Sequence, residues 1–213
     1  MSLQNECKRC GTCCENGGPA LHGSDMTLIE NCLISIESLI AIRKGELAHD
    51  PVTDSLKPVK KEFLKIAGKK GTWECLFYEK VLNGCTIYEN RPLACSVLKC
   101  WDTEETLKLA GRDLLSRLDI IKADDPMRKH IKKHEMLFPV PDLMGLSSPS
   151  SKMVKKLEKI CNREIDHRMK IVNKLELTVA KELFYFGRPI FELLHPLGFR
   201  VMGAGKGIKL DFL

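Results

Sequence analysis

Near its N-terminus the chain reads Cys7-Lys8-Arg9-Cys10-Gly11-Thr12-Cys13-Cys14, with two residues between successive cysteines and then an adjacent pair. A spacing of two residues lets a tight loop direct both sulfurs to one zinc ion, at Zn–S distances of about 2.3 Å. The same spacing is typical of loops that hold successive irons of an iron–sulfur cluster. The side chains of adjacent residues diverge, so one sulfur of the Cys13–Cys14 pair is available to a second centre.

Four more cysteines follow within the first 100 residues, and all eight lie in polar, glycine-rich or hairpin-forming contexts. We therefore predict that the metal ligands are the thiolates of Cys7, Cys10, Cys13, Cys14, Cys75, Cys85, Cys95 and Cys100. Arg9, Arg91 and Lys99 lie beside these residues in the sequence, and we predict that they offset the thiolate charge. The other two cysteines, Cys32 and Cys161, follow an apolar helical spacing, and we interpret them as core residues.

Whether these cysteines form disulfides depends on the cellular compartment in which the protein is located. The N-terminus has no basic start, no apolar run and no small-residue cleavage site, so we expect a cytoplasmic protein, whose thiols stay reduced. The most apolar stretch, residues 32–42, is too short to span a bilayer and contains Glu37, so no membrane partner is expected. A disulfide between adjacent Cys13 and Cys14 would also be strained. Metal ligation is therefore the favoured interpretation.

Composition and charge narrow the class of protein. The chain has 213 residues, of which 44% are hydrophobic and 29% charged, enough to bury a core without crosslinks. The formal net charge of +6 counts every cysteine as neutral. Metal-bound thiolates would offset most of that charge, so nucleic acid is an unlikely partner. Metal ions are the expected ligands, and a protein partner is left open.

Periodicity predicts a mainly α fold with a small cysteine-rich loop and β-hairpin module, an irregular α+β arrangement. Residues 1–24 are expected to form a loop. The predicted helices cover residues 24–44, a stretch starting at 103, residues 125–137 and residues 150–185. The predicted hairpins pair residues 73–78 with 85–88, around the turn signal Asn83-Gly84, and residues 199–201 with 208–210. We expect a cysteine-cluster module at 1–102 and a helical region at 103–213, packed as one unit.

Other patterns are interpreted without assigning a function to them. The glycine-rich segment 202–207 lacks the Ser/Thr and the following helix of a phosphate-binding loop, so we predict a turn. His130 and His134 are four residues apart among lysines, which favours a solvated helix face. The basic stretches 57–70 and 152–159 carry interleaved apolar residues and are interpreted as amphipathic helices. His22, near the first cluster, is a minor candidate ligand.

The N-terminal cluster, together with Cys85-Thr86-Ile87-Tyr88-Glu89-Asn90-Arg91-Pro92-Leu93-Ala94-Cys95 and Cys100, resembles the YkgJ-type cysteine-cluster family, with its CxxCxxCC motif. The resemblance covers residues 5–102. It implies chelation of zinc or iron in one or two centres, with the cofactor either a zinc ion or an iron–sulfur cluster. Flagellin lysine N-methylase carries a related cysteine cluster.

Three functions remain open at this point. The first is a metal-binding cysteine-cluster protein used in electron transfer or as an accessory to metal or redox chemistry. The second is an enzyme, either an S-adenosylmethionine-linked lysine N-methylase resembling the flagellin enzyme or a redox enzyme, although no binding motif for that cofactor can be recognised. The third is a zinc-stapled protein-interaction module.

Overall fold

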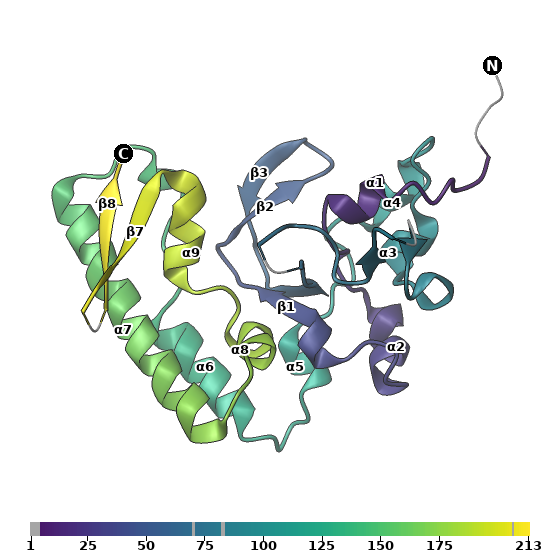
Figure 1. The fold of residues 1–213 in the computed structure, drawn as a ribbon. Coiled ribbons are helices and arrows are strands. Elements are labelled where there is room, and N and C mark those ends of the chain that lie inside the picture. Colours follow the sequence, from purple (N-terminus) through teal and green to yellow (C-terminus); the bar gives the residue numbers. More distant parts are fainter. Residues whose placement is uncertain (1–4, 70, 82–83, 206) are drawn as a thin grey trace.

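The computed structural model describes residues 5–69, 71–81, 84–205 and 207–213. Short helices and strands make up the N-terminal half, and longer helices with a terminal hairpin make up the C-terminal half (Figure 1). The described helices are α1 (Thr12–Glu15), α2 (Met26–Glu30), α3 (Leu93–Val97), α4 (Glu104–Leu109), α5 (Arg117–Ile120), α6 (Met127–Leu137), α7 (Ser151–Leu175), α8 (Val179–Phe186) and α9 (Ile190–Leu194). Single 3₁₀ turns cover Gly23–Asp25, Ile36–Ser38, Tyr88–Asn90, Met144–Leu146 and His195–Leu197.

Two-stranded antiparallel sheets accompany these helices. Strand β1 (Leu39–Ile42) pairs with β4 (Phe63–Ile66), β2 (Leu47–Asp50) with β3 (Ser55–Pro58), β5 (Tyr78–Glu79) with β6 (Gly84–Cys85), and β7 (Phe199–Ala204) with β8 (Gly207–Phe212). The α+β class predicted from the sequence is therefore confirmed. No helix in the described part of the chain is both long and apolar enough to cross a bilayer.

The predicted helix over residues 24–44 is wrong. The helix α2 ends at Glu30, and Cys32 adopts a φ of +57°, which an α-helix cannot contain. Residues 39–42 instead form β1, because their apolar side chains are covered by β4 and α8. Cys32 is exposed, so its assignment to the core is also wrong. The basic stretch 57–70 is not a helix either, since it contributes to β3 and β4.

The hairpin predicted near Cys75 forms, but it is shorter than expected. Among the residues that the structure describes here, Tyr78–Glu79 and Gly84–Cys85 pair as strands, with Tyr78 opposite Cys85. Cys75 joins Gly68 in an isolated bridge, and Thr86 leads into a 3₁₀ turn instead of extending the strand. Asn83, half of the predicted turn signal, lies outside the described residues.

The C-terminal half matches its predicted periodicity in most places. The helix predicted at 125–137 is confirmed as α6, and the terminal hairpin is confirmed as β7 and β8, which pack on α7. The helix predicted at 150–185 is interrupted once. Glu176, at a φ of +49°, ends α7, and the Thr178 side chain accepts a hydrogen bond from the Lys181 amide to begin α8.

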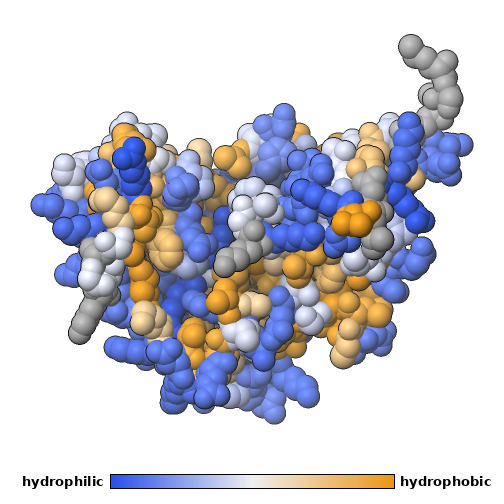
Figure 2. Space-filling view, in the orientation of Figure 1, coloured by the Kyte–Doolittle hydropathy of each residue, from blue (hydrophilic) through white to orange (hydrophobic). Residues whose placement is uncertain are grey.

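Two large clusters of buried hydrophobic residues form most of the core. One surrounds the β1–β4 sheet and includes side chains of α6 and α8, with Ile131 and Phe184 among its members. The other lies under the terminal hairpin and includes Cys161, which is completely buried, as predicted for a core cysteine. Hydrophilic residues cover most of the face in Figure 2, while hydrophobic residues reach the surface over α2 and α3.

Buried charges join the two halves. The Arg43 and Arg117 guanidinium groups both donate to Glu135 of α6, at 2.9 and 2.8 Å. His134, expected on a solvated helix face, is fully buried, which corrects that interpretation. Its Nε2 lies 3.1 Å from Oε1 of Glu164 on α7, a buried carboxylate that supplies the polar partner a buried imidazole needs.

Candidate metal centre

Five of the eight predicted ligands line one cavity of about 220 Å³ in the N-terminal half. They are Cys13, Cys14, Cys75, Cys85 and Cys95, and they come from α1, from the segment before β5, from β6 and from α3. The rest of the wall is mostly apolar, with Ile66 and Phe77 among its residues. The structure thus brings sulfurs from separate stretches of sequence to one mostly apolar cavity.

Gly11 sets the position of the first two sulfurs. It adopts a φ of +82°, and its carbonyl accepts hydrogen bonds from the Cys14 and Glu15 amides at 2.8 and 2.9 Å. A side chain at this position would collide with the phenol ring of Tyr78. The tight turn starts α1 and leaves the Cys13 and Cys14 sulfurs 3.9 Å apart.

Backbone contacts bring the next two sulfurs close to this pair. The Cys75 amide donates to the Cys14 carbonyl at 2.7 Å, and the Cys75 side chain is only 6% exposed. Cys85 lies on β6, opposite Tyr78 of β5. Tyr78, whose ring lies against Gly11, therefore also connects the segment of Cys75 with Cys85 through the short hairpin.

Asp25 positions the helix that carries Cys95. Its buried carboxylate accepts one hydrogen bond from the Leu93 amide at the start of α3 and one from the His22 amide, both at 2.8 Å. No local pattern in the sequence indicates this contact, which spans 68 positions. The imidazole of His22 lies 2.9 Å from the Arg112 carbonyl and does not line the cavity.

The cavity disfavours charged sulfur in the absence of a cation. Burial raises the pKa of the Cys14 thiol, and the neighbouring Cys13 raises it further. Burial also raises the pKa of Cys95 to about 12, with further increases from Cys75, Cys13 and Cys85. Arg91 lines the cavity and acts in the opposite direction on Cys95.

The other two predicted cations do not line the cavity. The Arg9 and Arg91 guanidinium carbons are both 4.1 Å from the centre of the Tyr88 ring, so the two cations contact the same aromatic side chain. The Lys99 ammonium pairs with Glu105 at 3.3 Å on the surface. Of the three, only Arg91 is in a position to act directly on the five sulfurs.

Three predicted ligands do not line the cavity. Cys7 and Cys10 are exposed in the segment before α1, where the Cys10 sulfur is 3.4 Å from the Thr12 hydroxyl, a contact that lowers the pKa of Cys10. Cys100 is exposed beyond α3. All ten cysteines of the chain lie in the described residues, and the structure has them as thiols.

The donor chemistry of the cavity fits a metal that prefers sulfur. Within the described residues, no three His, Cys, Asp or Glu side chains are already arranged as the ligands of an ion. The cavity nevertheless collects five thiols, and the buried Thr106 hydroxyl on its wall has no hydrogen-bond partner among the described residues. A thiolate or an inorganic sulfide would supply the acceptor that this hydroxyl lacks.

An α+β fold with cysteines of four segments around one cavity defines a cysteine-cluster protein. The profile of the CxxCxxCC family, described as a "Putative zinc- or iron-chelating domain", matches residues 6–112, which is half of the chain. The chain belongs to this family, as its motifs predicted. No curated protein and no solved structure matches the chain, so the relation to flagellin lysine N-methylase stays a prediction.

Proposed function

We propose that the protein holds an iron–sulfur cluster, ligated by cysteines of the cavity, and serves in electron transfer or as an accessory to redox chemistry. The observation that carries this proposal is the convergence of five cysteines from four segments on one cavity. The membership of a zinc- or iron-chelating family supports the metal but leaves its identity open.

The size of the cavity favours a cluster over a single ion. Four sulfurs at about 2.3 Å from one zinc ion leave no free space between them. The cavity of about 220 Å³ is several times the volume of roughly 30 Å³ that one water molecule occupies in the liquid. A group of several iron and sulfide atoms would fill that space, and a cluster bound there would supply one-electron transfer.

Each residue of the cavity has a role in this proposal. Cys13, Cys14, Cys75, Cys85 and Cys95 provide the ligands, with Cys7, Cys10 and Cys100 available from exposed segments to complete the set or to serve a second centre. With a cluster bound, Arg91 would offset negative charge, and the Thr106 hydroxyl, which has no partner among the described residues, would donate to sulfur. The apolar part of the wall would reduce the contact of the cluster with water. The cytoplasm is the proposed location, since thiols stay reduced there.

Protein purified without oxygen tests the proposal. We expect a brown protein that absorbs visible light and contains iron and acid-labile sulfide, and we expect Cys75→Ser and Cys95→Ser to lose most of both. The matched controls are Cys161→Ser, a buried cysteine outside the cavity, and Cys32→Ser, an exposed one. Both controls should retain the metal.

Two results would oppose the cluster. A colourless protein with bound zinc, lost on Cys95→Ser, would replace the cluster with a structural zinc site and favour the zinc-stapled module. A protein that takes up neither metal under reducing conditions would remove the metal centre altogether. Loss of metal from Cys161→Ser in a folded protein would show that the cavity has been assigned the wrong sulfurs.

A further inference from the structure

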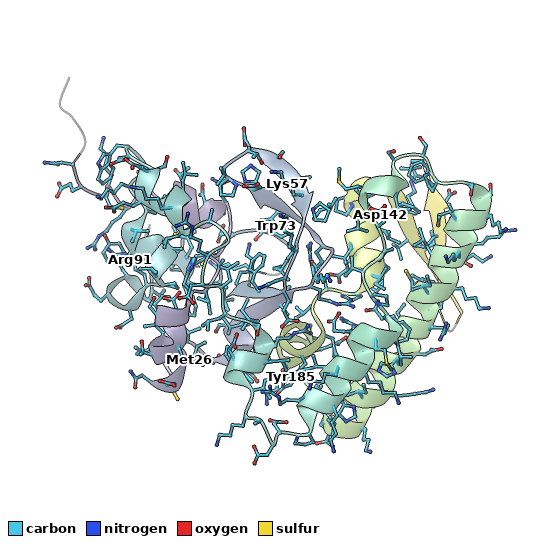
Figure 3. All side chains as sticks on the ribbon, turned by 180° about the vertical axis from the view of Figure 1, so that it is seen from behind. Met26, Lys57, Trp73, Arg91, Asp142 and Tyr185 are labelled. Atoms are coloured by element: carbon cyan, nitrogen blue, oxygen red, sulfur yellow. The ribbon has the colours of Figure 1, made fainter. Side chains whose placement is uncertain are left out.

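A second, larger cleft lies between the two halves of the molecule. It encloses about 690 Å³, within the range of small-molecule sites, and such sites often lie between domains. Strands β1 and β4 and the segment before Trp73 form one wall, and α8, α9 and β7 form the other. In Figure 3 Trp73 lies near the middle of the molecule. The cleft shares no residue with the cysteine cavity.

Two positive charges face one aromatic ring in this cleft. The Lys65 ammonium is 5.9 Å from the centre of the Trp73 ring, and the Arg188 guanidinium carbon is 5.5 Å from it. Burial and the charge of Arg188 both lower the pKa of Lys65. Repulsion between two half-buried cations is costly unless an anion lies between them.

The two cations differ in their carboxylate partners. Arg188 binds Glu46 through Nε and one terminal nitrogen, at 3.3 and 2.8 Å, and its other terminal nitrogen, Nη1, has no acceptor among the described residues. Across the same described residues, no carboxylate forms an ion pair with Lys65. Glu192 lines the same wall as Arg188, so a second anionic group on the ligand would be repelled there.

Apolar surface fills the rest of the cleft. The Trp73 side chain is 63% exposed, unusual for so large an apolar group, and Phe191 and Leu183 line the facing wall. A flat ring could stack on the indole while its anionic group lies between the two cations.

We propose that this cleft binds a small organic acid, one carboxylate carried on a flat apolar body, with the carboxylate at Lys65 and Arg188 and the ring against Trp73. The proposal does not depend on the metal centre. The walls of the cleft contain no cysteine, and the cleft would recognise the ligand by charge and shape alone.

Titration calorimetry with 2-naphthoate and its uncharged analogue 2-naphthamide tests the proposal on the full chain. The two probes share a shape and differ in charge, so we expect naphthoate to bind at least about tenfold more tightly. Lys65→Met, which leaves Arg188 as the one remaining cation of the pair, should reduce this difference severalfold and leave the affinity for naphthamide unchanged. Trp73→Ala should weaken both probes. The metal content of each variant, measured in parallel, should stay equal to that of the parent.

Lys57→Met is the matched control, because Lys57 is an exposed lysine on β3 outside the cleft (Figure 3). It should bind both probes like the parent protein. Lys65→Gln, which keeps a polar group of similar length, provides a second folded variant and should behave like Lys65→Met. Equal affinities for the two probes, full naphthoate binding by both Lys65 variants, or no binding of naphthoate at millimolar concentration would each overturn the proposal.

Discussion

At the scale of single residues, Gly11 and Tyr78 decide whether the N-terminal cysteines reach the cavity. The positive φ of Gly11 and the phenol ring against it leave no space for any side chain. The sequence shows this glycine within the cysteine motif, but it does not show which distant residue contacts it. That contact joins positions 11 and 78, and only the folded chain brings them together.

Replacing Gly11 with alanine should destabilise the protein by about 2 kcal/mol or more, because backbone strain and a steric collision add. Gly111→Ala is the matched control. Gly111 also has a positive φ, of +70°, but a side chain there would meet nothing within 4 Å. It should cost about 1 kcal/mol, from strain alone. Denaturant unfolding measures both, and equal costs would contradict the role assigned to Tyr78.

Cys32 and Cys161 show the limit of residue-level prediction. Both follow apolar helical spacing in the sequence, yet Cys161 is buried in α7 whereas Cys32 is exposed after α2. Helical spacing of apolar residues predicts which side chains are buried only where the segment forms a helix. The long amphipathic pattern around Cys161 forms a helix of 25 residues that packs on the terminal hairpin, and the short pattern around Cys32 does not form one.

At the scale of elements, the predictions that depend on local interactions agree with the structure, and the prediction for β1, which depends on a partner distant in the sequence, does not. The helix α6 and the terminal hairpin were predicted because their periodicity and turn residues act locally. Strand β1 was predicted as a helix because its partners on β4 lie 21 positions (Ile42 to Phe63) to 27 positions (Leu39 to Ile66) away, and no local pattern indicates the pairing. Residue type and spacing indicated all eight cysteines as candidate ligands. They did not indicate that five of these cysteines line one cavity and that Cys7, Cys10 and Cys100 lie outside it.

Asp25 tests how one element is held against another. Asp25→Asn keeps one oxygen for the Leu93 or the His22 amide but turns an N–H group toward the other donor, so we expect a loss of about 1–3 kcal/mol. Because α3 carries Cys95, bound metal should also decrease. Unfolding and metal analysis provide the two measurements.

The control for this variant is Asp119→Asn. Asp119 receives both of its hydrogen bonds, from the Ser116 amide and hydroxyl, on a single oxygen at an exposed helix start. An asparagine oxygen can replace that acceptor, so the control should stay near the parent in both measurements. A similar response from the two variants would argue against a special role for Asp25.

At the scale of the whole molecule, buried polar groups join regions that the sequence placed in two modules. Arg43 of the first region contacts Glu135 and Glu164 of the second, at 2.9 and 3.5 Å. The core around β1 and β4 likewise includes Phe184 of α8. The division at residues 102 and 103, and the packing of both regions as one folding unit, stay predictions.

The buried His134 predicts how stability depends on pH. Burial, with the charges of Arg43 and Arg168 opposed by Glu164, lowers the pKa of His134 from 6.5 to about 4. Between these values the unfolded chain binds a proton that the folded chain does not. Stability should therefore decrease as pH falls from 6.5 to 4, by up to about 3 kcal/mol from this group.

Denaturant unfolding between pH 7 and pH 4 measures this dependence. His134→Gln should be less stable than the parent at neutral pH but should lose less stability on acidification. His130→Gln, one turn earlier on α6, should keep the parental dependence. If the parent and His134→Gln lose stability in parallel, the imidazole is not the group that responds.

The alternation of side chains along β4 has a consequence for communication within the molecule. Lys65 lines the cleft, and its neighbour Ile66 lines the cysteine cavity, so the two spaces lie back to back across one layer of polypeptide. The positive charge of Lys65 already acts on Cys75 through this layer. Whatever neutralises the lysine on one side therefore alters the electrostatic potential at sulfur on the other.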